Sequence, residues 1–371
     1  MRIVIDLTSL ADNFTGIERY AACISREMIK QSAEEYVLIF KEKIHASFVD
    51  ICEQKNVEPV VLKPCHKLLF NQIRLPWALR KYKADWYLFL AFPVPVLLFK
   101  KNMISTIHDI CCWDCPETMN GLSKWYFRIS HRVAMWKCRY IITISEFSKK
   151  RIVERLKYRK EKLLLVYCGI DEKFRRLEIT DEKRQELIEK YQLPDRYLLS
   201  LSTLEPRKNL SLLIRAYAKL IEQKQIETPL VLAGRKGWKM DSFLEGISES
   251  VRSKIIITGF IEDEDLPYIY QQADLFVFPS MYEGFGIPPL EAMACGVPVL
   301  SSDAASMPEV LGDAAYYFQS GDADMLAKCL KEMSILSNKG KQSLTENGAS
   351  QVLKYMWNVE AKKLLEHLQC K

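Results

Sequence analysis

Short apolar runs recur along the whole chain, and segments with helical periodicity or turn residues separate them. In the first half of the chain the runs cover residues 2–8, 36–40, 58–62, 85–90, 103–106, 140–144 and 163–166. In the second half they cover residues 197–201, 230–233, 255–258, 275–278 and 297–300. Apolar runs of this kind, alternating with helices, are typical of buried parallel strands. The pattern therefore predicts an α/β fold with two doubly wound parallel sheets.

Residues 172–193 separate the two series of strands. They are charged, have a helical pattern and end at Pro194. A chain of 371 residues is long enough for two domains, each with its own hydrophobic core. We therefore expect a first Rossmann-like domain over residues 1–180, a second over residues 181–355 and a final helix over residues 356–371.

Residues 275–303 hold the most informative pattern in the chain. An apolar strand is followed by the turn residues Pro279-Ser280 and then by Glu283-Gly284-Phe285-Gly286. Pro288 and Pro289 suit the first turn of a helix that starts at this point. The unpaired N–H groups of a helix start favour phosphate, and glycine lets a ligand approach the backbone closely. The segment predicts an anion-binding turn between a strand and a helix.

Glu283 and Glu291 lie eight residues apart, one before this helix and one inside its first turns. Carboxylates accept several hydrogen bonds and therefore suit the vicinal hydroxyls of a ribose or a hexose. The same residues also fit a simpler interpretation, in which Glu283 caps the helix and Glu291 is solvated. The two residue types alone leave both interpretations open.

The segment E-G-F-G-I-P-P-L-E-A-M-A-C-G-V-P-V, which starts at Glu283, resembles the signature of glycosyltransferase family 4. Ser280 before it and Met307-Pro308-Glu309-Val310 after it extend the resemblance. The resemblance implies a retaining, metal-independent enzyme of GT-B fold, with a nucleotide-sugar donor in the cleft between two facing Rossmann-like domains. It also implies that the C-terminal helix returns to the first domain.

The resemblance assigns donor contacts to this segment residue by residue. Glu291 would accept hydrogen bonds from the ribose hydroxyls, and Glu283 would accept them from the hydroxyls of the sugar. The turn and helix start that approach the donor would consist of Gly284, Phe285, Gly286 and Ile287.

A second group of candidate donor contacts follows the strand at residues 197–201. Its exit loop contains Thr203 and the motif E-P-R-K-N, in which Arg207 and Lys208 are adjacent cations. Two cations at the carboxyl end of a strand can clamp a diphosphate, although an isolated pair is more often ordinary surface charge. The motif resembles the donor-phosphate motif of family 4, which implies a catalytic role for both cations. The family often has Arg at the position of Ser202, which leaves open whether this site has a third cation.

His108 follows the strand at residues 103–106, so it lies at the carboxyl end of a parallel strand, where open α/β sheets bind ligands. A lone histidine is more often structural than catalytic. The resemblance, however, places at this position a histidine that hydrogen-bonds the donor sugar. It also implies that Gly16, in the loop before the first helix, approaches the donor phosphate or the acceptor. Phe260 would lie where the nucleobase is held.

These residues predict a glycosyltransferase that moves a hexose onto a saccharide acceptor in cell-surface polysaccharide synthesis. As the nucleoside diphosphate departs, negative charge builds up on its β-phosphate, and Arg207, Lys208 and the N–H groups near Gly286 would stabilise that charge. No enzyme nucleophile is evident in the first domain, which favours attack by the acceptor on the same face of the sugar. The E-P-R-K-N variety of the motif favours mannose from GDP-mannose.

Three other classes of protein remain as alternatives. A nucleotide-sugar epimerase shares this fold, but the combination of E-P-R-K-N with G-F-G-I-P-P-L-E argues against it. A NAD-dependent oxidoreductase would need G-x-G-x-x-G after the first strand, and the sequence lacks that motif there. A non-catalytic nucleotide-sugar-binding protein is the third alternative. Release of nucleoside diphosphate from a radiolabelled nucleotide sugar would separate a transferase from all three.

Positive charge is concentrated in residues 121–160, which hold twelve Lys or Arg and two Glu. This local charge of +10 exceeds the net charge of +6 for the whole chain. A stripe of apolar residues at helical spacing and a row of cations run side by side in it: Trp125, Ile129, Val133 and Trp136, and Lys124, Arg128 and Arg132. An ordinary helix would bury the stripe and solvate the cations, whereas a basic face with interfacial aromatics suits an anionic membrane surface or a lipid-linked acceptor. No nucleic-acid motif accompanies the charge.

Neither the cysteines nor the acidic runs predict a metal cofactor. The motif Cys112-Trp113-Asp114-Cys115, preceded by Cys111, lacks the second ligand pair that a zinc site needs. Asp263-Glu264-Asp265 is similar to the D-x-D metal motif of the other large glycosyltransferase fold, but acids in the first turn of a helix are the simpler interpretation. We expect plain thiols and no metal.

The start of the chain and its longest uncharged run bear on location. Asp6 interrupts the first apolar run, which indicates a strand and not a signal peptide. The longest uncharged run, residues 86–99, has 14 residues, fewer than the ~18 that span a bilayer. We therefore expect a cytoplasmic protein that residues 121–160 hold at the inner face of the plasma membrane. Its acceptor would be lipid-linked or an oligosaccharide, and nucleic acid would not be a partner.

Overall fold

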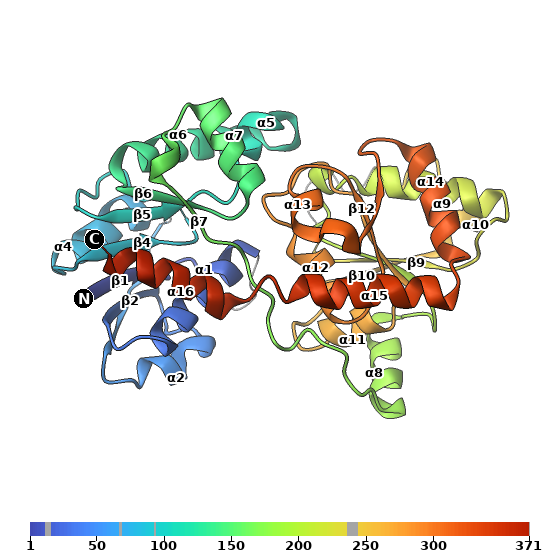
Figure 1. Ribbon diagram of the computed structural model, residues 1–371, viewed down its shortest axis with the longest axis horizontal. Helices are drawn as coiled ribbons and strands as arrows, with labels where there is room; N and C mark the ends of the chain where they lie inside the picture. Colours follow the sequence, from blue (N-terminus) through green and yellow to red (C-terminus); the bar gives the residue numbers. More distant parts are fainter. Residues whose placement is uncertain (12–15, 67–68, 93, 236–243, 371) are drawn as a thin grey trace. The chain divides into compact units, whose positions relative to one another are not determined.

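The computed structural model of the chain describes residues 1–11, 16–66, 69–92, 94–235 and 244–370 (Figure 1). The chain divides into two compact units, Met1–Gly169 with Tyr355–Lys371, and Ile170–Lys354. Residues 170–180, which the sequence pattern placed in the first domain, therefore belong to the second unit.

The first unit is built on a seven-stranded parallel sheet of order β3-β2-β1-β4-β5-β6-β7 (Figure 1). Its strands are β1 (Arg2–Asp6), β2 (Glu35–Lys41), β3 (Val57–Leu62), β4 (Trp86–Phe89), β5 (Met103–Thr106), β6 (Tyr140–Thr143) and β7 (Leu163–Leu165). Its α-helices are α1 (Gly16–Lys30), α2 (Val49–Cys52), α4 (Leu75–Arg80), α5 (Cys111–Asp114), α6 (Gly121–Lys137), α7 (Glu146–Leu156) and α16 (Trp357–Gln369). Shorter helical segments are η1 (Ala46–Phe48), η2 (Phe70–Arg74), η3 (Pro116–Thr118) and η4 (Lys160–Lys162).

The middle of this sheet is buried along its whole length. β4, β5 and β6 are buried at every position. Their register places Leu88 beside Ile104 and Ser105 beside Ile141. Parallel strands with helices on both faces have continuous apolar sequences. The same apolar runs allowed these strands to be predicted from the sequence.

The C-terminal helix α16 packs against α1 within the first unit (Figure 1). Trp86 donates its indole N–H to the carbonyl of Leu368 at 3.1 Å. Gly169 allows the start of α16 to come close, because a Cβ at that position would overlap the Trp357 backbone. The predicted return of the C-terminal helix to the first domain is confirmed.

The second unit is built on a six-stranded parallel sheet of order β10-β9-β8-β11-β12-β13. Its strands are β8 (Leu198–Leu201), β9 (Leu230–Ala233), β10 (Ile255–Gly259), β11 (Leu275–Phe278), β12 (Val299–Ser302) and β13 (Tyr316–Phe318). Its α-helices are α8 (Asp181–Tyr191), α9 (Leu210–Glu222), α10 (Glu249–Arg252), α11 (Leu266–Gln271), α12 (Ile287–Ala294), α13 (Met307–Leu311), α14 (Ala323–Ser334) and α15 (Asn338–Val352). Two turns, η5 (Pro206–Lys208) and η6 (Gly312–Ala314), complete it.

Both sheets have the order of a doubly wound fold, which confirms the predicted fold class. The order reverses at the first strand of each sheet: β1 lies between β2 and β4, and β8 lies between β9 and β11. At such a point the loops that leave the two neighbouring strands diverge, and α/β proteins bind ligands between them. The carboxyl ends of β8 and β11 are therefore the first place to look for a site in the second unit.

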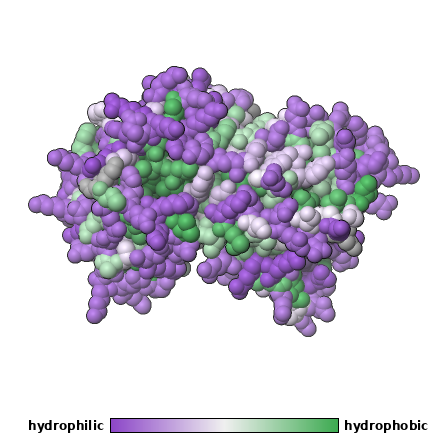
Figure 2. All heavy atoms as spheres, in the orientation of Figure 1, coloured by the Kyte–Doolittle hydropathy of each residue, from purple (hydrophilic) through white to green (hydrophobic). Residues whose placement is uncertain are grey.

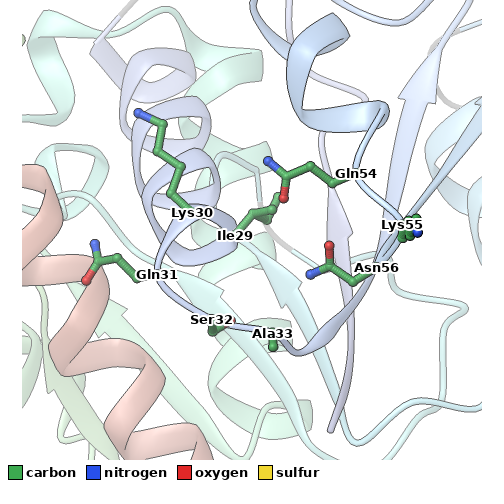
Figure 3. A pocket seen from close by; sticks show the side chains of 8 residues that line it. All are labelled: Ile29, Lys30, Gln31, Ser32, Ala33, Gln54, Lys55 and Asn56. Carbon is green, nitrogen blue, oxygen red and sulfur yellow. The ribbon is translucent and has the colours of Figure 1, made fainter.

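A shallow hollow of about 510 Å³ lies in the first unit, at the amino ends of strands of its sheet (Figure 3). It is lined by Ile29, Lys30, Gln31, Ser32, Ala33, Gln54, Lys55 and Asn56. These residues precede β2 and β3, so the hollow lies at the amino ends of the strands. This position gives no topological reason to expect a donor there.

Candidate active site

The turn before α12 takes its shape from glycine. Gly286 has φ +96° and directly precedes the helix. A Cβ at this position would overlap the Met307 side chain of α13, so both the backbone angle and the close contact require glycine. The Ser306 hydroxyl lies 3.0 Å from the carbonyl oxygens of Glu283 and Phe285 and can donate to either. The turn is therefore held from the side of α13.

The residues of this turn differ in exposure. Gly284, Phe285 and Gly286 are buried, whereas Ile287 at the start of α12 is half-buried. Pro288 and Pro289 occupy the first turn of the helix, as the sequence predicted.

Arg207, Lys208 and Glu283 meet at the carboxyl ends of β8 and β11. Lys208 Nζ donates to Glu283 Oε1 at 2.6 Å, and Arg207 Nη1 donates to Glu283 Oε2 at 3.1 Å. The Ser280 hydroxyl donates to Glu283 Oε1 at 2.5 Å. Arg207 also donates to the carbonyl of Tyr282 at 2.8 Å. Three of the predicted catalytic side chains thus form one cluster where the strand order reverses.

A tight turn presents the two cations. Arg207 and Lys208 end η5, and Asn209 then takes a left-handed conformation with φ 54° before α9 begins. Met281 N donates to the carbonyl of Arg207 at 3.0 Å, which ties the loop after β8 to the loop after β11. Glu205 accepts a hydrogen bond from Arg207 Nη2 at 2.9 Å and holds the guanidinium from the other side.

The Glu283 carboxylate is ionised at neutral pH. Burial alone would raise its pKa, but the charges of Lys208 and Arg207, together with hydrogen bonds from Lys208 and Ser280, outweigh burial and lower the pKa to about 2. The Arg207, Lys208 and Glu283 side chains are only 21%, 12% and 10% exposed. With Glu205 paired to Arg207, the cluster holds two cations and two carboxylates, and these ion pairs fix the positions of both cations.

Glu291 lies inside α12 and is buried. Its Oε2 accepts a hydrogen bond from the hydroxyl of Tyr270 at 2.8 Å. Tyr270 belongs to α11 and packs against Phe276 of β11, with ring centroids 5.5 Å apart. The sequence did not single out Tyr270, because a tyrosine among apolar residues is typical of a core position. In the structure it orients the carboxylate that the resemblance assigns to the ribose.

Phe260 and Thr203 lie at the carboxyl ends of β10 and β8, the two strands that flank β9. Phe260 follows β10, is 37% exposed and has the Arg235 guanidinium 4.6 Å from its ring centre. Gly234 N donates to the carbonyl of Gly259 at 2.8 Å, which aligns the ends of β9 and β10. Thr203 is exposed in the loop after β8. Arg235, which the sequence analysis did not select, is a further residue that could contact a nucleobase.

His108 lies in the first unit, directly after β5. Its Nε2 is 3.0 Å from the carbonyl oxygen of Leu90. Burial lowers the pKa of His108 to about 4, so the ring is neutral at pH 7. Because the carbonyl can only accept, Nε2 carries the proton and Nδ1 is the ring's acceptor. Gly16 is the first residue of α1, and the loop predicted before it falls on residues 12–15, outside the described residues.

Cys112 of the C-x-x-C motif lies beside a histidine. Cys112 Sγ lies 3.7 Å from His131 Nδ1. Burial raises the pKa of Cys112 to about 12 and lowers the pKa of His131 to about 4. At neutral pH the pair is therefore an uncharged thiol beside an uncharged imidazole.

The acids of the D-x-D segment make ion pairs with lysines. Asp265 accepts from Lys183 at 3.0 Å and from Lys190 at 2.7 Å, which fastens α8 to the start of α11, and Asp263 pairs with Lys173. Among the described residues, no group of three or more His, Cys, Asp or Glu side chains could hold a metal ion. In the part of the chain that the structure describes, no helix is long and apolar enough to cross a bilayer.

Comparison with known proteins gives matches to both units. The model "Glycosyltransferase Family 4" matches residues 14–174, and the model "Glycosyl transferases group 1" matches residues 180–351. O-antigen chain mannosyltransferase B of Escherichia coli is 31% identical to this chain, and the alignment covers 96% of both proteins. O-antigen chain mannosyltransferase RfbU of Salmonella typhimurium is 25% identical over 66% of this chain and 63% of its own length.

The fold likewise matches a solved structure over its full length. The crystal structure of Anabaena HepE in complex with UDP and glucose has a TM-score of 0.74 and 17% identity, with 100% of both chains covered. The match in fold and the near full-length relative agree with the family models. The chain belongs to glycosyltransferase family 4, within the glycosyl transferases of group 1, and is a glycosyltransferase of GT-B fold.

Proposed function

We propose that this glycosyltransferase moves a mannosyl group from GDP-mannose to a lipid-linked saccharide, with retention of configuration and without a metal ion. The observation that carries the proposal is the convergence of Arg207 and Lys208 on Glu283 beside the helix start at Gly286. The names of two relatives, both O-antigen chain mannosyltransferases, support mannose as the sugar.

The two cations suit the leaving group. When the bond between the sugar C1 and the phosphate oxygen breaks, its electrons pass to the β-phosphate, whose new charge Arg207 and Lys208 stabilise. The acceptor hydroxyl attacks C1 on the same face, forms the new C–O bond and gives its proton to the departing phosphate oxygen. This route retains configuration and needs no nucleophile from the protein.

Glu283 and His108 would act on the sugar. Glu283 is held as an anion and keeps both cations in position, and its remaining lone pairs suit sugar hydroxyls. The neutral ring of His108 offers Nδ1 as an acceptor for a further hydroxyl. Glu291, oriented by Tyr270, would accept from the ribose.

Guanine fits the residues at the end of β9. Arg235 carries a planar fork of N–H donors, and the O6 and N7 atoms of guanine accept two such bonds side by side. Phe260, over whose ring the Arg235 guanidinium lies, offers an aromatic face. The lipid-linked acceptor is supported by the positive charge of residues 121–160, which suits an anionic membrane surface.

The proposal is tested with purified protein, a panel of nucleotide sugars and a membrane extract that contains lipid-linked saccharides. GDP-mannose is expected to raise the melting temperature most and to release GDP only when the extract is present, with or without a chelator. If a uridine nucleotide sugar raises the melting temperature and GDP-mannose does not, the assignment of GDP-mannose as the donor is wrong. Recovery of an epimerised sugar instead of a glycosylated product would show the alternative activity.

A further inference from the structure

Three segments of the first unit expose large apolar side chains to solvent. The first runs from the residue before η2 into α4, the second is the loop after β4, and the third is α6. Leu122 is 89% exposed, Trp136 75%, Phe99 71%, and Trp77 and Trp125 60% each. The exposed residues are Leu69, Ile73 and Trp77; Val96, Leu97 and Phe99; and Leu122, Trp125, Ile129 and Trp136. We call these ten residues the apolar surface.

Most of the predicted stripe on α6 faces outward: Trp125, Ile129 and Trp136 are exposed, whereas Val133 is half-buried and packs against the core. Leu122, Trp125, Ile129 and Trp136 follow one another at helical spacing, and all four are exposed. The buried residues of α6 are Ser130, His131 and Ala134, on the other side of the helix. The exposed residues Leu122, Trp125, Ile129 and Trp136 are therefore not part of the core.

Hydrogen bonds and a ring contact link the three segments of the apolar surface to one another. Val96 N donates to the side-chain oxygen of Gln72 at 2.8 Å, which ties the loop to η2. Lys137, the last residue of α6, donates to the carbonyls of Val96 and Leu98. Its Nζ also lies 3.7 Å from the ring centre of Phe99. The three segments thus meet at the C-terminal end of α6.

Positive charge surrounds this surface. Residues 69–101 hold six Lys or Arg and one Asp, and residues 121–139 hold five Lys or Arg and no acid. Several cations lie over the exposed rings: Lys81 is 4.7 Å from the ring centre of Trp77, and Arg128 is 5.6 Å from that of Trp125. Most of the surface visible in Figure 2 is hydrophilic, with apolar residues in smaller groups. Contiguous exposed apolar residues mark an interaction site.

We propose that the apolar surface docks on an anionic phospholipid bilayer, its aromatic and aliphatic side chains at the headgroup level and its cations against the lipid phosphates. The proposal rests on the lipid-linked acceptor of the proposed function. Charge favours this occupant: tryptophan with flanking Lys and Arg suits a membrane interface, whereas the centres of protein interfaces are depleted in Lys. The surface begins near the carboxyl edge of the sheet, because the loop after β4 and the α5–α6 segment both leave from it. An acceptor anchored in the bilayer would thus lie close to His108.

Sedimentation with vesicles tests the proposal. Full-length protein is mixed with vesicles of phosphatidylcholine containing one third phosphatidylglycerol, and with vesicles of phosphatidylcholine alone. The test variant replaces Leu122, Trp125 and Trp136 by Ser. A matched control replaces Ile335 and Leu353 by Ser, which are 75% and 72% exposed in the second unit. Wild type and control are expected to sediment with the anionic vesicles, and the test variant to bind at least tenfold more weakly.

Two outcomes would overturn the docking surface. In one, wild type stays in the supernatant with anionic vesicles, or the test variant sediments like wild type. In the other, wild type is a dimer in solution and the test variant a monomer, which would make the surface an interface between copies. Stabilisation by GDP-mannose, measured without vesicles, should be the same for wild type and test variant. If GDP-mannose stabilises neither protein, the result would count against the proposed function and not against the surface.

Discussion

The buried ion pair between Lys208 and Glu283 sets the electrostatics of the site at the residue scale. A buried carboxylate with two cations and a hydroxyl as partners stays charged, and it fixes the positions of those cations. Removal of one partner leaves the others uncompensated, which is costly in a sheltered place. Single substitutions in this cluster should therefore have large effects.

Lys208→Ala should lower turnover by raising the activation free energy by about 3 kcal/mol or more, because it removes a cation that faces the negative charge developing on the leaving group. Release of nucleoside diphosphate at saturating donor measures this. Lys219→Ala is the control, since Lys219 forms an exposed ion pair with Asp324 at 2.7 Å in the same unit. Activity of Lys208→Ala within threefold of wild type would mean that the clamp lies elsewhere.

Glu283→Gln should change the pH dependence of stability. The pKa of Glu283 is about 2 in the folded protein against 4.5 for a free side chain. A lowered pKa means that the ionised form contributes stability above pH 4.5, and that this contribution is lost as the pH falls toward 2. The shift corresponds to about 3 kcal/mol. Denaturant unfolding from pH 6 to pH 3 should show the difference between wild type and variant shrinking, and a difference constant with pH would refute the charge assignment.

Glu291→Ala should raise the Michaelis constant for the donor more than it lowers turnover, because a ribose contact is equal in the ground and transition states. Tyr270→Phe should have the same effect at a smaller size, since the carboxylate remains but loses its hydrogen bond of 2.8 Å. Calorimetry with GDP alone measures the loss of binding affinity in each of the two variants. If neither variant weakens GDP binding, Glu291 is not the ribose contact.

The resemblance to family 4 selected Glu283, Arg207 and Lys208, which the structure places in one cluster. Their partners were harder to select. The bond between Tyr270 and Glu291 joins two helices, and the contact of Arg235 with Phe260 joins the ends of two strands. Such pairs depend on strand order, which a single sequence does not contain.

At the scale of elements, apolar runs predicted the described strands other than β13, including the partly exposed β3 and β10. β13 was missed: its run Tyr316-Tyr317-Phe318 is only three residues long and lies at the edge of the sheet, where Tyr316 is exposed and Tyr317 half-buried. The stripe of α6 was visible, but periodicity defines a face without saying which way it points. The outward direction follows from Ser130, His131 and Ala134, which the helix buries instead.

Gly286→Ala should destabilise the turn before α12 and weaken donor binding. A left-handed backbone costs an alanine roughly 1–2 kcal/mol, and the overlap with Met307 adds to this. Gly321→Ala is the matched control, because Gly321 has φ +86° and no atom within 4 Å of an added Cβ. The free energy of unfolding should fall further for Gly286→Ala than for Gly321→Ala. Equal losses would show that only the backbone angle matters.

At the scale of the whole molecule, charge is distributed unevenly. The net charge is +6, and because residues 121–160 carry +10, the rest of the chain carries −4. The structure changes how this charge should be probed. Arg128 donates to the carbonyl of Cys112 at 2.8 Å, and both Arg128 and Arg132 lie over the ring of Trp113. Replacing those two arginines would disturb the packing of α6 as well as the charge.

Replacement of Lys83, Lys101 and Lys124 by Gln therefore tests the electrostatic part of membrane docking more cleanly. At low salt each cation near an anionic surface contributes about 1 kcal/mol, so the triple variant should bind anionic vesicles much more weakly than wild type. Rising salt should weaken wild-type binding steeply, because exposed charges are screened beyond about 8–10 Å at physiological ionic strength. The apolar side chains are insensitive to screening, so wild type and the lysine variant should converge at high salt on the same residual binding. Binding that falls to zero at high salt in both proteins would mean that Trp125 and Trp136 stay in water and that charge alone holds the protein at the membrane.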